Sequence, residues 1–273
     1  MTKIIAVANQ KGGVGKSTSV VNLAASIGLR GQRVLCIDMD PQGNTTSGFG
    51  IKKKSVTVTS YDILMGKRRI EDGIEKTAFE NVSVICSTPA LAGADIELVN
   101  LDNRSNRLKM QLLTVKNDYD YVFIDCPPSL SLLTINALCA ADSVLIPLQC
   151  EYYSLEGLSQ LVESIRRVKQ HYNPNIDIDG IVFTMFDSRL NLTNQVVAEV
   201  QKHFPKKIYR TVIPRNVKLS EAPSFGKPVV YYDRSSRGAE AYEKLSEEML
   251  TRHGIKKIEP KPIKKKLFGT VKL

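Results

Sequence analysis

NQKGGVGKST, from Asn9 to Thr18, is the stretch that decides the fold. It lies between an apolar run typical of a buried strand and a segment of helical period, which is the setting of a phosphate-binding loop. The usual pattern G-x-x-x-x-G-K-[ST] requires a glycine at position 10, where this chain has Gln10. The loop carries a second lysine instead, Lys11, five residues before the expected Lys16. The stretch therefore predicts a phosphate-binding loop with an additional positive charge.

The glycines of this loop allow positive φ and a close approach of backbone N–H groups to phosphate oxygens, and the following helix N-terminus adds partial positive charge. We expect Lys16 on the β- and γ-phosphates of a nucleotide and the Ser17 hydroxyl on Mg²⁺. The predicted nucleotide-binding residues are Lys11, Gly12, Gly13, Val14, Gly15, Lys16, Ser17 and Thr18. A plain glycine turn with a surface lysine is the weaker interpretation, because G-G-x-G-K-S stands between a strand and a helix.

The rest of the chain alternates between short apolar runs and longer segments of helical period. Strands are predicted at 3–9, 33–38, 82–86, 121–125, 143–148, 178–186 and 209–213, and helices at 17–30, 94–116, 131–141, 154–171, 192–203 and 236–253. This order predicts an α/β fold, a P-loop NTPase with a mainly parallel twisted sheet and helices on both faces. Ligands of such sheets bind beyond the carboxyl ends of the strands.

The composition, with 42% hydrophobic and 24% charged residues among 273, is typical of a globular protein. We predict one ATPase domain over 1–254 and a disordered Lys/Pro-rich tail over 255–273. The tail holds seven lysines and one glutamate, so it supplies +6 of the net charge of +10. A basic chain favours polyanionic partners, either nucleic acid or an anionic membrane surface.

Targeting signals and cysteine pairs are missing from the sequence. It contains no apolar run of ~18 residues and no leader pattern, so a cytoplasmic location is expected. The five cysteines form no C-x-x-C pair, which favours buried reduced thiols over a metal site or disulfides.

Lys11 stands at the entrance side of the loop, away from the oxygens that Lys16 is expected to bind. Its natural target is the nucleotide of a partner subunit. Lys11 would then be the lysine counterpart of an arginine supplied in trans. ATP would then form part of a two-fold interface between two copies of the chain. The alternative is a solvated loop lysine.

Three aspartates follow predicted strands and complete the expected site. Asp125 ends YVFID, where an acidic residue holds the magnesium shell in phosphate-loop enzymes. Asp38 and Asp40, in CIDMDPQGN, are the candidates for orienting the attacking water, with Asp40 nearer the expected γ-phosphate. A simple DPQG turn would explain one of these acids but not both. We therefore predict Ser17, Asp125 and Asp38 around magnesium, Lys11, Lys16 and Asp40 as catalytic residues, and slow hydrolysis because no dedicated strong base is present.

With KGGVGKST, DMDPQGN and FIDCPPS considered together, the sequence resembles the ParA/Soj family of chromosome- and plasmid-partition ATPases, relatives of MinD. The resemblance continues through QCEYYSLEGLSQL, TMFDSR and IPRNVKLSEAPSFGKPV and covers residues 2–252. It implies an ATP-sandwich homodimer in which Lys11 acts across the interface, Mg²⁺ as cofactor, and a role in hydrolysis for Asp40. It also implies that Pro214 and Asn216 bracket the adenine.

The same resemblance implies binding to double-stranded DNA without sequence preference, and hence a nucleoid-associated location. Arg189 and Lys218 match the DNA-binding positions of the family. A ParB-type centromere-binding protein is implied as the activator of hydrolysis, and a replication initiator is a further candidate partner. One predicted helix carries a cluster of basic residues, which we interpret as a solvated surface. They are Arg166, Arg167 and Lys169.

Two other functions remain open at this point. A MinD-like membrane switch would use the tail, where Ile263, Leu267, Phe268 and Val271 fall on one helical face among lysines. A small-molecule kinase or an iron protein like that of nitrogenase would use the same loop, but the C-G-G-F context of the latter is absent and no acceptor pocket is identified.

Overall fold

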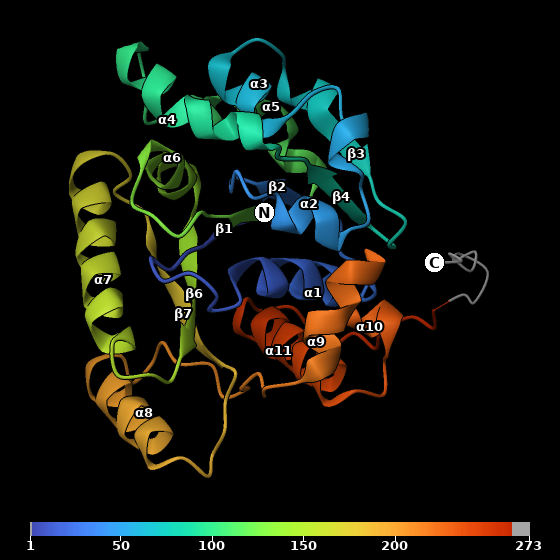
Figure 1. Cartoon of the computed structure of the whole chain (residues 1–273), viewed down its shortest axis with the longest axis vertical. Coiled ribbons are helices and arrows are strands. Elements are labelled where there is room, and N and C mark those ends of the chain that lie inside the picture. The colour runs from blue at the N-terminus through green and yellow to red at the C-terminus, as the bar shows by residue number, and fades with distance from the viewer. Residues whose placement is uncertain (1, 264–273) are drawn as a thin grey trace.

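The computed structural model describes residues 2–263, and Met1 and residues 264–273 lie outside the described part. Within 2–263 seven strands form one sheet in the order β3-β4-β2-β5-β1-β6-β7 (Figure 1). The strands are β1 (Lys3–Val7), β2 (Val34–Asp38), β3 (Ile74–Lys76), β4 (Val82–Ile85), β5 (Tyr121–Asp125), β6 (Ser143–Gln149) and β7 (Asp177–Thr184). All neighbours pair in parallel except β3, which runs antiparallel to β4. The prediction of a mainly parallel sheet is confirmed.

The strand register places the expected site residues at one edge of the sheet. Asp125 at the end of β5 is paired with Val7 of β1 on one side and with Asp38 of β2 on the other. The phosphate loop follows β1 directly, so the loop and both aspartates meet at the carboxyl edge. This is the edge at which α/β sheets bind ligands.

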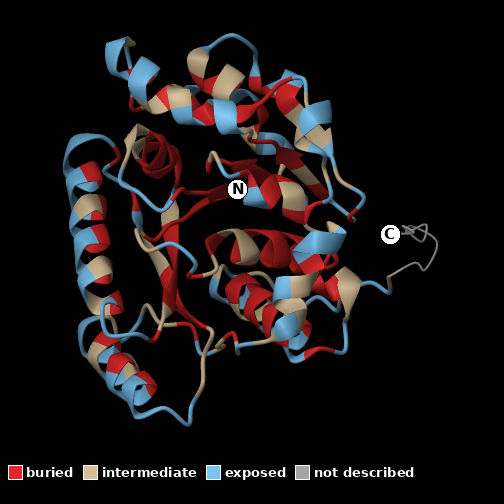
Figure 2. Ribbon diagram, viewed as in Figure 1, coloured by how far each residue is buried: buried red, intermediate tan, exposed pale blue. Residues whose placement is uncertain are grey.

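Helices cover both faces of the sheet (Figure 1). Their bounds are α1 (Lys16–Gly28), α2 (Asn44–Gly48), α3 (Ser60–Met65), α4 (Ala94–Glu97), α5 (Arg107–Val115), α6 (Leu132–Ala140), α7 (Ser154–His171), α8 (Asn191–His203), α9 (Val217–Glu221), α10 (Val229–Tyr232) and α11 (Arg237–Arg252). Alternate residues of β1 point to opposite faces, as the pleat requires. Ile4 and Ala6 join a core with α3 to α8, and Ile5 and Val7 join a core with α1 and α11. Both cores are fully buried in the middle of the molecule (Figure 2).

The predicted helix over 94–116 is interrupted. α4 ends at Glu97 and is followed by a 3-10 turn over Leu98–Asn100, but α5 begins only at Arg107, after a stretch in which Asn103 has a φ of 53°. A left-handed residue cannot continue a right-handed helix, and asparagine adopts this conformation more readily than most residues. The continuous helix was therefore a wrong prediction.

The predicted strand over 209–213 is also wrong. The segment runs beside β7, where the amide of Tyr209 donates to the Ile181 carbonyl (2.9 Å) and that of Ile213 to the Phe183 carbonyl (2.8 Å). Between them, the amides of Arg210 and Thr211 donate to the carboxylate of Glu248 in α11, at 2.8 and 2.9 Å. The segment is thus anchored to a helix as well as to a strand.

The first part of the basic tail lies against the domain. The amide of Lys261 donates to the carbonyl of Leu29 at the end of α1 (2.8 Å), and Ile263 packs against Ala25, Leu29 and Val230. Within residues 2–263 no helix is both long and apolar enough to cross a bilayer. All five cysteines are buried and free, as predicted.

Candidate functional site

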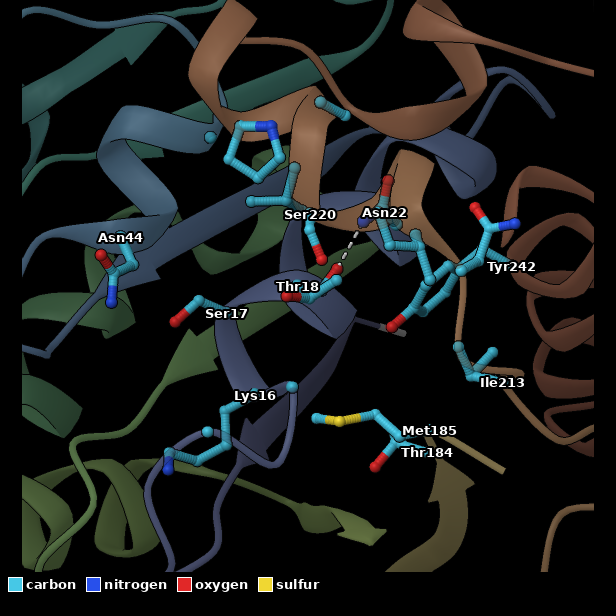
Figure 3. A pocket seen from close by; sticks show the side chains of 18 of the residues that line it. Lys16, Ser17, Thr18, Asn22, Asn44, Thr184, Met185, Ile213, Ser220 and Tyr242 are labelled. Carbon is cyan, nitrogen blue, oxygen red and sulfur yellow. Dashed lines mark hydrogen bonds between the residues drawn. The ribbon is translucent and has the colours of Figure 1, made fainter. Parts of the chain in front are cut away.

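A cavity of about 640 Å³ opens at the carboxyl edge of the sheet. Its walls come from the phosphate loop, the start of α1, the segment around α2, the end of β7 and the segment leading into α9. Figure 3 shows Lys16, Ser17 and Asn44 at one end and Ile213 and Tyr242 at the other, with Met185 facing Thr18 across the space. The cavity therefore has a polar end at the phosphate loop and a more apolar end at α11.

The phosphate loop has the backbone conformation that its glycines predict. Gly13 and Gly15 have φ angles of 77° and 89°, which residues with a side chain rarely adopt. The hydroxyl of Thr184, at the end of β7, donates to the carbonyl of Val14 (2.8 Å) and fixes the loop. Gly12, Gly13, Gly15, Lys16, Ser17 and Thr18 all line the cavity.

Lys16 is held inside the loop. Its ammonium donates to the carbonyl of Lys11 (3.0 Å), and the residue is only 7% exposed. Burial lowers the pKa of Lys16, and the nearby carboxylates of Asp125 and Asp40 partly offset this effect. A buried ammonium facing a glycine-rich loop fits the binding of an anion.

Lys11 points elsewhere. Its ammonium forms an ion pair with Glu151, just after β6, and its side chain is 34% exposed. Lys11 is not one of the described residues that line the cavity. The two lysines of one loop therefore face different surroundings, one inside the cavity and one at the surface.

Asp38 and Asp125 are both fully buried side by side. Burial raises the pKa of Asp38 to about 6, and burial together with the charge of Asp38 raises the pKa of Asp125 to about 8. Asp38 accepts from the Asp40 amide (3.2 Å) and from the amide and hydroxyl of Thr46 (2.8 and 2.7 Å). Two buried carboxylates on paired strand positions repel each other and favour a cation beside them.

Asp125 differs from Asp38 in having a free oxygen. Its Oδ2 accepts from the Thr45 hydroxyl (2.8 Å), whereas its buried Oδ1 has no hydrogen-bond partner. The Ser17 hydroxyl also lowers the pKa of Asp125 and so lies close to it. A carboxylate oxygen without a partner beside a hydroxyl is the oxygen-rich setting that Mg²⁺ prefers, so these residues fit the metal.

Asp40 lies at the cavity wall and is 6% exposed. Its Oδ1 accepts from the amide of Gln42 (2.9 Å), which shapes the turn after β2. Asp40 is therefore part of the DPQG turn and also lies at the cavity wall, and its role in orienting water stays a prediction.

The far end of the cavity contains the two residues predicted to bracket the adenine. Pro214 and Asn216 both line it, together with Ile213 and Tyr242. The Asn216 side chain caps α9 by accepting from the Lys218 amide (3.0 Å). Sequence reasoning missed Met185, a lining residue with a φ of 48°, for which the sequence gives no signal.

The two predicted DNA contacts lie outside the cavity. Arg189, whose side chain is 86% exposed, is ion-paired with Asp187 (2.6 Å), and Lys218 is ion-paired with Glu221 (2.9 Å). The three basic residues of α7 are exposed as expected, and Arg167 is paired with Glu163. Each predicted DNA contact therefore has an acidic neighbour in this structure.

Comparison with known proteins adds to this geometry. A family model described as an AAA domain matches residues 2–178. The chain is 57% identical over 249 residues to the sporulation initiation inhibitor protein Soj of Bacillus subtilis, covering 91% of this chain and 98% of that protein. It is 54% identical over 250 residues to the chromosome partitioning protein ParA of Myxococcus xanthus, covering 92% and 88%. Among solved structures, cobyrinic acid a,c-diamide synthase of Mycobacterium smegmatis with a bound ATP analogue and magnesium has a TM-score of 0.84 and 33% identity, covering 96% and 99%.

Proposed function

The chain belongs to the ParA/Soj family of chromosome-partitioning ATPases, and from this premise we propose a nucleotide-controlled cycle. Two copies of the chain dimerise around two ATP·Mg²⁺, and this dimer binds double-stranded DNA without sequence preference. Slow hydrolysis of ATP then releases the protein from DNA. The observation that carries the proposal is the divergence of Lys11 and Lys16, because one lysine of the loop serves the cavity and the other is presented at the surface.

We assign a separate role to each residue at the polar end of the cavity. When bound, ATP·Mg²⁺ supplies the reactive triphosphate and a metal charge. The ammonium of Lys16 and the backbone of Gly12, Gly13, Val14 and Gly15 hold the phosphates, and Thr18 supports the start of α1. Ser17 and Asp125 hold the magnesium, since Asp125 keeps an oxygen free. Asp40, a lone carboxylate at the wall, orients the attacking water, which supports a slow intrinsic rate.

The apolar end takes the base. Pro214 and Asn216 stand on the segment before α9, and Ile213 and Tyr242 add apolar surface. This supports adenine between these residues, at the end of the cavity opposite to Asn44.

The surface residue Lys11 supports dimerisation around the nucleotide. Glu151 is only a half-exposed partner, with 48% of its side chain accessible, so a triphosphate of higher charge can replace it. Tyr152 and Tyr153 follow directly and are 75% and 73% exposed, which offers apolar surface for a second copy beside Lys11.

Arg189 and Lys218 are proposed to exchange their acidic neighbours for DNA phosphates. Each ion pair is exposed and therefore weak, so replacement by a polyanion costs little. The proposal extends to a ParB-type partner that stimulates hydrolysis, to a replication initiator as a further target, and to a nucleoid-associated, cytoplasmic location.

Sedimentation of the protein with ATP, ADP or no nucleotide, each with and without DNA, tests the cycle. A dimer only with ATP, and DNA binding only by that dimer, is the expected result. A protein that is saturated with ATP but stays monomeric, with Lys11 still ion-paired to Glu151, would overturn the proposal.

A MinD-like membrane switch is the second candidate. Its apolar face needs Ile263, but this side chain packs against Ala25, Leu29 and Val230 within the domain. The remaining members of that face, Leu267, Phe268 and Val271, lie outside the described residues. The packing of Ile263 therefore counts against the membrane switch, because it removes one apolar side chain from the proposed membrane-binding face.

A further inference from the structure

Two consecutive threonines in α2 bind the two aspartates that end neighbouring strands. The Thr45 hydroxyl donates to Asp125 (2.8 Å), and the Thr46 hydroxyl donates to Asp38 (2.7 Å). Both threonines are fully buried. Threonine is a poor helix former, so its presence twice in a five-residue helix calls for a reason beyond helix propensity.

Thr46 is the more heavily bonded of the pair. Its amide also donates to Asp38 (2.8 Å), and its hydroxyl accepts from the amide of Ser87 (2.9 Å). The hydroxyl is thus a donor and an acceptor at once, which valine of the same shape cannot replace.

The segment between these contacts contains Asp40. It begins at Asp38, whose Oδ1 accepts from the Asp40 amide (3.2 Å), and it returns to Asp38 through Thr46. Within the segment, the carbonyl of Asp40 accepts from the Gly43 amide (2.9 Å). Asp38 therefore closes a small ring of backbone that carries Asp40 at the cavity wall.

We propose that Thr45 and Thr46 are positioning residues that hold Asp40 in place for hydrolysis, with Asp125 as the buried anchor of Thr45 and Asp38 as that of Thr46. This rests on the proposed function, because it takes the role of Asp40 from there. It gives Asp38 a different part from the magnesium ligand that the sequence predicts, since all three of its hydrogen bonds come from this segment.

The test compares Thr46→Val, Thr46→Ser and Thr45→Val with the control Thr77→Val. Thr77 is a comparable threonine in the β3–β4 connection, whose hydroxyl donates to the Val82 carbonyl (2.8 Å). We expect Thr46→Val to lower kcat at least tenfold with the Kd of ATP within twofold, and Thr45→Val to lower kcat less. Thr46→Ser should restore kcat to within threefold of the natural chain, and Thr77→Val should leave it unchanged.

Hydrogen exchange in the protein without nucleotide is the second measurement. Amides over 39–49 should exchange faster in Thr46→Val than in Thr46→Ser or Thr77→Val, while those of β5 keep their rates. Equal exchange and equal kcat in all variants would overturn the proposal, as would a loss of ATP affinity in parallel with kcat. If the natural chain hydrolysed no ATP, the proposed function would fail, and the exchange measurement would still decide whether these threonines hold the segment.

Discussion

The ammonium of Lys11 is ion-paired with the carboxylate of Glu151 in the same chain. Both side chains are partly exposed, so the pair contributes no more than about 1 kcal/mol. Lys11 is thereby kept away from the cavity that Lys16 occupies. In the proposed dimer this contact has to be broken before Lys11 reaches the partner's nucleotide.

Glu151→Gln should therefore strengthen ATP-dependent dimerisation. Each copy loses one competitor worth up to about 1 kcal/mol, so the dimer as a whole gains up to about 2 kcal/mol and its dissociation constant falls up to about thirtyfold. Analytical ultracentrifugation with ATP measures this directly. In a Lys11→Ala background the same substitution should have no effect, and an equal gain in both backgrounds would show that Glu151 acts independently of Lys11.

Lys16→Ala and Asp40→Ala should separate binding from hydrolysis. Lys16→Ala removes the buried ammonium and should abolish nucleotide binding and dimerisation. Asp40→Ala should keep both and remain on DNA as an ATP dimer, with hydrolysis lowered at least a hundredfold. The exposed Asp118 serves as the control through Asp118→Ala. Normal hydrolysis by Asp40→Ala would transfer the role to another group.

Removal of residues 264–273 should weaken DNA binding and leave the fold intact, because the contacts of Lys261 and Ile263 with α1 are kept. Four lysines are lost, so the salt dependence of binding should fall by up to about 0.9 log units of slope for each phosphate contact that disappears. DNA and liposome co-sedimentation measure the two alternatives in parallel. Loss of liposome binding alone would favour the membrane switch.

Asp179→Asn should destabilise the protein in a pH-dependent way. Burial tends to raise the pKa of Asp179, but the hydrogen bond and charge of His253, with the hydroxyls of Tyr209 and Ser143, hold it below its usual range. His253 and Tyr209 lie 2.8 and 2.6 Å from the carboxylate. Its contribution to stability is thus present above the unfolded pKa of about 3.9 and is lost as the pH falls through the lower folded value.

Urea unfolding measures this effect. Near pH 7 the substitution should cost about 2 kcal/mol, and the difference from the natural chain should shrink below about pH 4. A difference that stays constant from pH 7 to pH 3.5 would mean that the carboxylate charge is not what stabilises the fold.

The sequence predicted the parts of the fold that depend on local pattern. The bounds of β5 and α7 agree with the predicted ranges, because each is a single apolar or amphipathic run with clear ends. The phosphate loop and the edge position of Asp38 and Asp125 also followed from motif and strand order. Whether these residues perform the predicted chemistry stays a prediction.

What the sequence could not provide depends on distant partners. Glu248 binds the amides of Arg210 and Thr211 from 38 and 37 residues away, so an apolar run with strand pattern does not form a strand. The pairing of Lys11 with Glu151 spans 140 residues. Likewise, no motif indicates the hydrogen bonds of Thr45 and Thr46 with the two aspartates, and the one from Thr45 to Asp125 spans 80 residues.

The pairing of Asp38 with Asp125 makes the alignment of two strands a condition of the chemistry. Adding or removing one residue inside β2 would place the Asp38 carboxylate on the opposite face of the sheet, although β2 would remain as hydrophobic as before. Insertions into this chain should therefore be made in the loops that connect the strands and helices, and not inside β2 or β5.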